Sequence, residues 1–313
     1  MEKSQRKHLA IAIVVASVSA LLAAFSFVEP LISPASKGDE WMTGLPDDRP
    51  LTRLSIPGSH DSGARYSAGD LSGKCQDSSI LEQLNYGVRF FDVRLYNYND
   101  SLLVCHGFID ENLSLSSFVA SVRVFLLAHP KEGVLASIKH ENYDQGASKD
   151  FETLLREEIA KNPTFWQTGR DLPANLGAIR GKITLISRYE KNTIGLDAYG
   201  DEGWQSDFGT STTFTLNHFR VQDHYKLSEN LTKWNEIALL IAEAGKDTTG
   251  SLLYLNFFSG YLTTGFPPTY SVSTAKYINP KVLNKELPSV HYGILICDFV
   301  TPALCQILWG VNA

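Results

Sequence analysis

The sequence predicts an α/β protein whose strands and helices build a (β/α) barrel, and three observations lead to this class. The chain has 313 residues, a length at which α/β barrels routinely form one domain. Hydrophobic residues make up 43% and charged residues 20% of it, so the chain is not disordered and has enough apolar residues for a sizeable core. Short apolar runs alternate with longer segments of helical periodicity, which predicts parallel strands joined by helices.

The first 28 residues differ from the rest of the chain. Three basic residues oppose one acidic residue there, so about −8 of charge falls on the remaining chain, since the whole carries −6. Residues 9–28 form an uncharged run of 20 residues, just long enough to cross a bilayer as a helix. A basic head before such a run is typical of a cleaved secretory signal and equally of a retained transmembrane anchor.

Both interpretations of residues 1–28 place the following chain outside the cytoplasm, because the positive flank stays inside. We therefore expect an extracytoplasmic protein, secreted or held at the membrane through residues 9–28. An even number of cysteines in an exported chain allows two disulfides, with three possible pairings. Cys105 lies in an apolar run and also fits a buried thiol.

Residues 29–50 contain several prolines and glycines and are interpreted as a linker, which leaves residues 51–313 as the folded domain. In order along this domain, apolar runs predict strands at 53–56, 88–95, 102–105, 134–139, 182–187, 219–223, 252–257 and 293–298. Helical periodicity predicts helices at 78–86, 114–129, 148–161 and 229–244. Seven or eight strands in this length predict a barrel, and no glycine-rich nucleotide-binding motif supports a Rossmann fold.

Polar residues follow most of the predicted strands. Because catalytic residues of barrels lie at the C-terminal ends of strands, these side chains are expected to meet at one rim. Two histidines suit paired general base and general acid, and an arginine stabilises negative charge on a phosphate. A carboxylate bonded to a histidine fixes its tautomer. This set predicts metal-free transfer at a phosphodiester, and its members are His60, Asp61, Asp92, Arg94, His106, Lys139, Arg188, Asp223 and Asp298.

Three sequence blocks carry a resemblance to a known family. Residues 56–63 (IPGSHDSG), residues 87–94 (GVRFFDVR) and the pair His106-Gly107 resemble the X-region of phosphatidylinositol-specific phospholipase C, of the single-domain bacterial type. The likeness spans about residues 50–300, and Ser59 stands where the family more often has threonine. The resemblance implies a distorted (β/α)8 TIM barrel. It also implies a lyase-like reaction that releases diacylglycerol and inositol 1,2-cyclic phosphate from phosphatidylinositol or glycosylphosphatidylinositol.

The resemblance assigns five catalytic residues. His60 corresponds to the general base for the inositol 2-hydroxyl and Asp298 to the carboxylate that orients it. His106 corresponds to the general acid for the diacylglycerol oxygen, with Asp61 as its partner. Arg94 corresponds to the residue that binds the phosphate.

Five further residues are expected at the substrate. The resemblance implies that Lys139, Arg188 and Asp223 bind inositol hydroxyls and that Tyr225 stacks on the ring. Asp92 matches a family position that helps to hold the catalytic residues in place. Two alternatives stay open, because Asp92 also fits a structural anchor for Arg94 and Tyr225 also fits ordinary packing at the rim.

Arg94 decides the expectation on cofactors. In calcium-dependent relatives the corresponding environment supplies metal ligands, and an arginine replaces that charge while contacting phosphate oxygens bidentately. We therefore expect no metal and no cofactor, although Asp92 and Glu141 leave a residual metal site as an alternative. His140 is expected to be structural. Residues 257–270 fit a packed loop better than a lip that touches lipid.

The expected partners are a phosphatidylinositol-containing membrane surface and an inositol phospholipid substrate, for a monomeric enzyme. The net charge of −6 argues against nucleic acid as a partner. One rival is a metal-dependent glycerophosphodiesterase-like barrel, which Arg94 fits poorly. A second rival is a catalytically silent barrel that binds inositol lipid or a protein, although all five expected catalytic residues are present.

Overall fold

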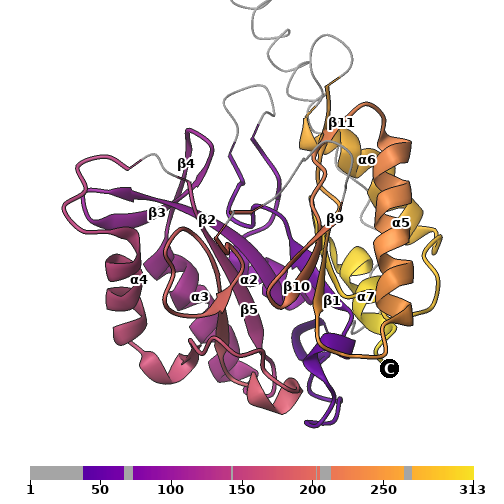
Figure 1. Cartoon of the computed structure of the whole chain (residues 1–313), viewed down its shortest axis with the longest axis horizontal. Helices are drawn as coiled ribbons and strands as arrows, with labels where there is room; N and C mark the ends of the chain where they lie inside the picture. The colour runs from indigo at the N-terminus through magenta and orange to yellow at the C-terminus, as the bar shows by residue number, and fades with distance from the viewer. Residues whose placement is uncertain (1–37, 67–72, 142–143, 202, 205–212, 264–269) are drawn as a thin grey trace, which may run out of the picture. The chain divides into compact units, whose positions relative to one another are not determined.

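The structure is a computed structural model that describes residues 38–66, 73–141, 144–201, 203–204, 213–263 and 270–313 (Figure 1). The N-terminal leader, the signal or anchor expected at residues 1–28, lies outside these ranges. Across the described ranges, no helix combines the length and the apolar character that a membrane span needs.

Parallel strands form the main sheet of the described chain. Its hydrogen-bonded order is β6-β7-β5-β2-β1-β14-β12-β10-β9, in which only β9 runs antiparallel to its neighbour. The strands on this path are β1 (Ile56–Ser59), β2 (Phe90–Tyr98), β5 (Val134–His140), β6 (Trp166–Gln167), β7 (Ile183–Arg188), β9 (Thr213–Leu216), β10 (Phe219–Gln222), β12 (Leu253–Phe257) and β14 (Ile294–Cys297). This is the expected distorted (β/α)8 barrel, and within the described residues no strand pairing joins its two edges.

The remaining strands lie off this path. An antiparallel hairpin of β3 (Ser101–His106) and β4 (Ile109–Ser114) extends from β2. β8 (Leu196–Asp197) pairs with β7, while β11 (Lys226–Leu227) and β13 (Tyr261–Leu262) pair with each other. The apolar run at 102–105 is therefore a strand as predicted, but it belongs to this hairpin and not to the barrel wall.

Helices pack outside the barrel strands. They are α2 (Ile80–Tyr86), α3 (Leu115–Ala128), α4 (Phe151–Ala160), α5 (Asn230–Lys246), α6 (Ser271–Leu283) and α7 (Pro302–Gly310). Figure 1 shows α3 and α4 on the side of β5, and α5, α6 and α7 on the side of β10. Four short 3-10 helices lie at η1 (Gly38–Glu40), η2 (Leu51–Arg53), η3 (Pro163–Phe165) and η4 (Leu176–Ala178).

Both faces of the barrel strands are buried, which is why these strands read as continuous apolar runs. Phe90 and Ile296 belong to one hydrophobic cluster together with other inward-facing positions. Phe91 belongs to a second cluster, in which Phe118 and Val122 of α3 pack on the strands. The alternation of neighbouring residues between clusters follows the two-residue period of a strand.

Residues 38–50 belong to the folded domain, and the expectation of a linker there was wrong. Trp41 and Met42 are buried in the same cluster as Phe90. The Trp41 indole also donates a hydrogen bond of 2.9 Å to the Gly87 carbonyl. Prolines and glycines in this segment break regular structure, but they do not prevent its apolar side chains from packing.

Candidate active site

The expected site residues meet at the C-terminal ends of the barrel strands. They surround a cavity of about 520 Å³. Seven of the ten line this cavity: His60, Arg94, His106, Lys139, Arg188, Asp223 and Tyr225. The other three, Asp61, Asp92 and Asp298, are buried directly behind the lining residues and contact them.

The turn after β1 delivers two of these residues. The His60 amide continues the sheet by donating to the Cys297 carbonyl at 2.9 Å, which fixes the backbone beside β14. Asp61 then adopts a left-handed conformation with φ 39°, which aspartate tolerates better than most residues. His60 therefore reaches the cavity while the Asp61 side chain is completely buried.

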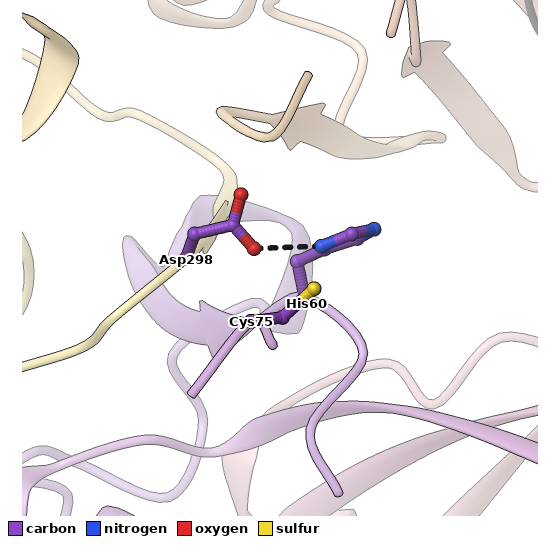
Figure 2. A group of neighbouring side chains, drawn as sticks. All are labelled: His60, Cys75 and Asp298. Carbon is purple, nitrogen blue, oxygen red and sulfur yellow. Dashed lines mark hydrogen bonds and ion pairs between the residues drawn. The ribbon is translucent and has the colours of Figure 1, made fainter. Parts of the chain in front are cut away.

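His60 is held from both sides. Its Nδ1 lies 2.7 Å from Oδ1 of Asp298, and Figure 2 shows this contact. Its Nε2 lies 2.8 Å from Nη2 of Arg94. Because a guanidinium only donates, Nε2 is the acceptor and the ring proton is on Nδ1, which donates to Asp298. This tautomer leaves a basic nitrogen beside Arg94.

Asp92 anchors two arginines from behind the cavity. Its Oδ2 accepts from Arg94 at 3.0 Å and 3.2 Å, and its Oδ1 accepts from Arg188 at 3.2 Å. Burial raises the pKa of Asp92, but Arg94 and Arg188 outweigh burial and hold the pKa well below its usual range. Asp92 is fully buried and does not line the cavity, which favours the anchoring alternative over direct contact with a substrate.

His106 is held more loosely than His60. Its Nδ1 donates to the Gly73 carbonyl at 2.5 Å, and its Nε2 lies 3.6 Å from Oδ2 of Asp61. Burial raises the pKa of Asp61 more than the charges of Arg94 and His106 lower it. Neither carboxylate oxygen of Asp61 has a hydrogen-bond partner in the described structure.

The remaining expected residues line a further wall of the cavity, which begins beside Arg94 because Lys139 pairs with Arg94 across β5 and β2. Lys139 Nζ pairs with Glu141 at 2.6 Å, and Arg188 Nη2 lies 3.4 Å from Oδ2 of Asp223. Tyr225 presents its ring to the cavity, 6.0 Å between centroids from the ring of Tyr261. Cationic and anionic groups thus alternate along this wall, an arrangement able to bind several hydroxyl groups.

Several residues at the site were not predicted to belong to it, and Trp204 and Cys75 make the most informative contacts. Trp204 donates from Nε1 to Asp223 at 2.8 Å, and the Arg188 guanidinium lies 3.8 Å from the centre of its ring. Cys75 lies at the cavity, beside His60 and Asp298 (Figure 2). Both come from loops, where neither periodicity nor the strand-end rule places a side chain.

The cysteines differ from the expected disulfides. Cys75, Cys105, Cys297 and Cys305 are all buried free thiols. Cys105 is therefore a buried thiol, as the apolar run around it indicated, and not half of a disulfide. Burial raises the pKa of Cys105 to about 12. The even number of cysteines was misleading because each thiol is buried in the folded domain without pairing.

Residues expected outside the site have separate contacts. His140 lies 2.9 Å from Asp144 and stacks on Phe151 at 4.3 Å between ring centroids. Phe257 and Phe258, at the start of the segment 257–270 that was expected to be a packed loop, are buried, and residues 264–269 lie outside the described ranges.

The fold and the site together define a class: a barrel whose cavity is lined by two histidines, each near a carboxylate, and by an anchored arginine. A family model described as "Phosphatidylinositol-specific phospholipase C, X domain" matches residues 48–189. The 1-phosphatidylinositol phosphodiesterase of Staphylococcus aureus (strain Newman) is 32% identical over 280 residues, 83% of this chain and 88% of the relative. That of Listeria monocytogenes is 31% identical over 273 residues, covering 83% and 80%.

Solved structures agree with these relatives. A mutant of the phosphatidylinositol-specific phospholipase C from Staphylococcus aureus superposes with a TM-score of 0.75 at 29% identity, covering 87% of this chain and 96% of that chain. The enzyme from Listeria monocytogenes gives a TM-score of 0.68 at 27% identity, covering 88% and 99%. The chain belongs to the phosphatidylinositol-specific phospholipase C family, of the bacterial type, which confirms the resemblance found in the sequence.

Proposed function

We propose that this protein cleaves phosphatidylinositol to diacylglycerol and inositol 1,2-cyclic phosphate, without a metal ion. The observation that carries the proposal is the placement of His60 and His106 around Arg94 in one cavity. An in-line displacement needs a base and an acid on opposite sides of the phosphorus and a cation beside its oxygens.

His60 is the proposed general base. Asp298 holds Nδ1, so Nε2 takes the proton of the inositol 2-hydroxyl as the oxygen attacks phosphorus. The resulting imidazolium is stabilised by Asp298, as a carboxylate stabilises a protonated histidine generally. When the substrate enters, the Nη2 group of Arg94 exchanges its hydrogen bond with Nε2 for one with a phosphate oxygen, because Arg94 already lies beside the base His60.

His106 is the proposed general acid. Its Nδ1 proton is committed to the Gly73 carbonyl, so His106 acts in its doubly protonated form and the proton for the leaving oxygen comes from Nε2, on the side of Asp61. The diacylglycerol oxygen takes that proton as the phosphorus–oxygen bond breaks. Slower hydrolysis of the cyclic product reverses the roles, with His106 accepting a proton from water.

Substrate recognition is assigned to the cavity wall that begins beside Arg94. Lys139, Arg188 and Asp223 bind inositol hydroxyls, and Tyr225 packs on the ring face. Glycosylphosphatidylinositol presents the same diester and is a second substrate to be compared in the assay. Trp204 holds Asp223 and Arg188 in place.

The proposal places the enzyme at a phosphatidylinositol-containing membrane surface, outside the cytoplasm and as a monomer. The acidic body is repelled by an anionic surface on average, so local contacts or a retained leader must bring it to lipid. Residues 1–28 act as the cleaved signal or the anchor, and residues 51–313 with the packed segment 38–50 form the catalytic domain. N-terminal sequencing of the exported protein distinguishes the two fates of the leader.

The first test is lipid cleavage by the full chain in mixed micelles with a metal chelator. We expect release of diacylglycerol and cyclic inositol phosphate from phosphatidylinositol, with undiminished rates in chelator. Loss of all activity in chelator would overturn the metal-free mechanism. Absence of cleavage under all conditions would favour the catalytically silent barrel.

The second test is His60→Ala and His106→Ala, each measured against His218→Ala. General acids and bases contribute about 10²–10⁴-fold, so each of the first two variants is expected to lose that much activity. His218 contacts the backbone carbonyl of Arg170 at 3.2 Å and does not line the cavity. Its removal is therefore expected to leave the rate of lipid cleavage within a factor of about two. A histidine whose removal leaves the rate unchanged has no part in the mechanism.

A further inference from the structure

The floor of the cavity contains a thiol that the mechanism does not use. Cys75 belongs to two overlapping groups of potential metal ligands, one with His60 and Asp298 and one with Asp61 and His106. Within each group the ligand atoms all lie within 4.8 Å of one another. Figure 2 shows the thiol next to the His60 and Asp298 side chains.

The first group is already committed to other contacts. Both ring nitrogens of His60 are engaged, one with Asp298 at 2.7 Å and one with Arg94 at 2.8 Å. Ligands at zinc bond lengths in a tetrahedron are separated by roughly 3.3–3.7 Å, so a distance of 2.7 Å marks a hydrogen bond rather than a pair of metal ligands. A metal bound by either ring nitrogen would have to break the contact that this nitrogen already makes.

The second group has the spacing and the free acceptors of a metal site. Oδ2 of Asp61 and Nε2 of His106 are 3.6 Å apart, within the range expected for two ligands of one ion. The Asp61 side chain is fully buried, and both of its oxygens lack a hydrogen-bond partner within the described residues. A buried carboxylate in this state gains more from a cation than a solvated one does.

The His106 ring is oriented as metal-binding histidines usually are. Such histidines donate their other ring proton to a carboxylate, a carbonyl or water, which fixes the tautomer. Here Nδ1 donates to the Gly73 carbonyl at 2.5 Å, so the neutral ring directs its Nε2 lone pair toward Asp61. The backbone therefore already supplies the supporting contact.

The donor set and the charge select the ion. Thiolate, imidazole and carboxylate together suit Zn²⁺ and similar borderline cations far better than Mg²⁺ or Ca²⁺. Coordination releases the Cys75 thiol proton and the His106 Nε2 proton to solvent, and the thiolate and the Asp61 carboxylate then balance the two charges of the ion. Arg94 lies 3.4 Å from Asp61, so its positive charge repels the ion. Arg94 keeps its own ion pair with Asp92 when the ion binds.

We propose that Asp61, Cys75 and His106 form an inhibitory site for Zn²⁺ or a similar thiol-binding divalent cation. The inhibition rests on the proposed function, because the ion occupies the His106 nitrogen that protonates the leaving group. Three protein ligands leave the fourth position of the ion open to the cavity, where water or a phosphate oxygen binds.

The first experiment measures binding without using activity. The full chain, freed of metal, is titrated with zinc chloride against a chromophoric chelator, and we expect one strong site that excess magnesium or calcium does not displace. Cobalt(II) at the same site is expected to show thiolate-to-metal charge-transfer absorption. Cys75→Ala is expected to weaken zinc binding at least tenfold and to abolish that absorption, whereas Cys305→Ala, a buried thiol on α7, retains both.

The second experiment measures inhibition. Zinc is expected to suppress lipid cleavage by the native chain, and chelator is expected to restore it. Cys75→Ala is expected to need at least ten times more zinc, each protein being compared with its own zinc-free rate. Cys75→Ser provides the same comparison if the alanine variant fails to fold.

The outcomes separate the two proposals. Undiminished zinc binding by the folded Cys75 variants overturns the site, and binding without inhibition overturns its regulatory role. Activation by zinc overturns both the inhibition and the metal-free mechanism. A chain that cleaves no lipid overturns the proposed function alone, because the titration still decides whether the site exists.

Discussion

Two arginines five residues apart lie at opposite ends of the barrel and differ in how completely their donors are used. Arg89, just before β2, is fully buried and pairs with Glu132 at 2.8 Å and 2.9 Å. Its other donors reach four backbone carbonyls at 2.7–3.0 Å. The Phe125 ring covers it at 4.5 Å. All five N–H groups thus have partners inside the protein.

Arg94, on β2 itself, is incompletely partnered. Asp92 and His60 occupy Nε and Nη2. Among the described residues, Nη1 has only ion contacts of 3.4 Å to Asp61 and 3.8 Å to Glu141, both longer than strong charge-assisted hydrogen bonds. The side chain is 13% exposed, at the cavity. One edge of this guanidinium is available to a ligand.

The comparison teaches that charged groups with unused hydrogen-bonding capacity mark the end of the barrel that carries the candidate active site. The carboxylates show the same contrast. Glu132 accepts from Arg89 and from Thr43 at 2.9 Å, whereas burial raises the pKa of Asp61, whose oxygens lack hydrogen-bond partners in the described chain. One end uses charge to hold the fold, and the other end keeps charge available to a phosphate.

The largest expected effect is on stability, at the satisfied end. Arg89→Ala leaves Glu132 buried without its cation, which typically costs about 3–5 kcal/mol. Urea unfolding is expected to show that loss. The double variant Arg89→Met with Glu132→Leu removes both charges and is expected to recover most of it. A single variant that loses less than about 1 kcal/mol would contradict the structural role of Arg89.

The next effect is on catalysis, at the incompletely satisfied end. Arg94→Ala is expected to lower kcat/KM about 10²–10³-fold, the usual cost of removing a charge-stabilising donor. Its unfolding free energy is expected to change less than that of Arg89→Ala, because Asp92 keeps Arg188 at 3.2 Å. Equal losses of stability in the two variants would erase the distinction between the two ends.

The sequence predicted well that the site residues would lie together, because the C-terminal ends of parallel strands meet at one edge of the sheet. His60 and Lys139 follow this rule directly, at the ends of β1 and β5, whereas Arg94 lies in the middle of β2 because that strand continues past the barrel into the hairpin. Cys75 and Trp204 escaped it because they come from loops, whose return to the cavity depends on tertiary packing. No local pattern in the sequence carries that information.

Parts of the fold escaped prediction for identifiable reasons. β6 has two residues, too few to show a period. Pro280 lies inside α6, where it breaks the pattern of a helix. Trp41 and Met42 lie among turn-forming residues, so their burial was not evident.

A pH-dependent loss of stability is expected from the hairpin that carries His106. Glu111 accepts the backbone N–H groups of Arg65 and Tyr66 at 2.8 Å each, but burial raises its pKa from 4.5 to about 7. The native state then binds more protons than the unfolded state, so stability falls as pH rises from about 4.5 to about 7. The size is on the order of 1–3 kcal/mol.

Glu111→Gln tests this prediction, because the amide oxygen replaces the acceptor of both N–H groups without a charge. Urea unfolding at pH 5 and pH 8 is expected to show the native chain losing more stability than the variant across that interval. If the stability of the native chain depends on pH no more than that of Glu111→Gln, the buried Glu111 carboxylate does not destabilise the fold and the prediction is wrong.

The smallest effect concerns a third arginine, Arg188, which is held both by a buried carboxylate and by an aromatic ring. Arg188 is held by Asp92 and by the Trp204 ring, while Trp204 also donates to Asp223. Trp204→Phe keeps a ring for Arg188 but removes the hydrogen bond to Asp223, a loss of about 0.5–1.5 kcal/mol. KM for the inositol lipid is therefore expected to rise roughly 2- to 10-fold, with kcat little changed. Trp234→Phe, on α5, is the matched control. A fall in kcat at constant KM would show instead that Asp223 acts mainly in the transition state.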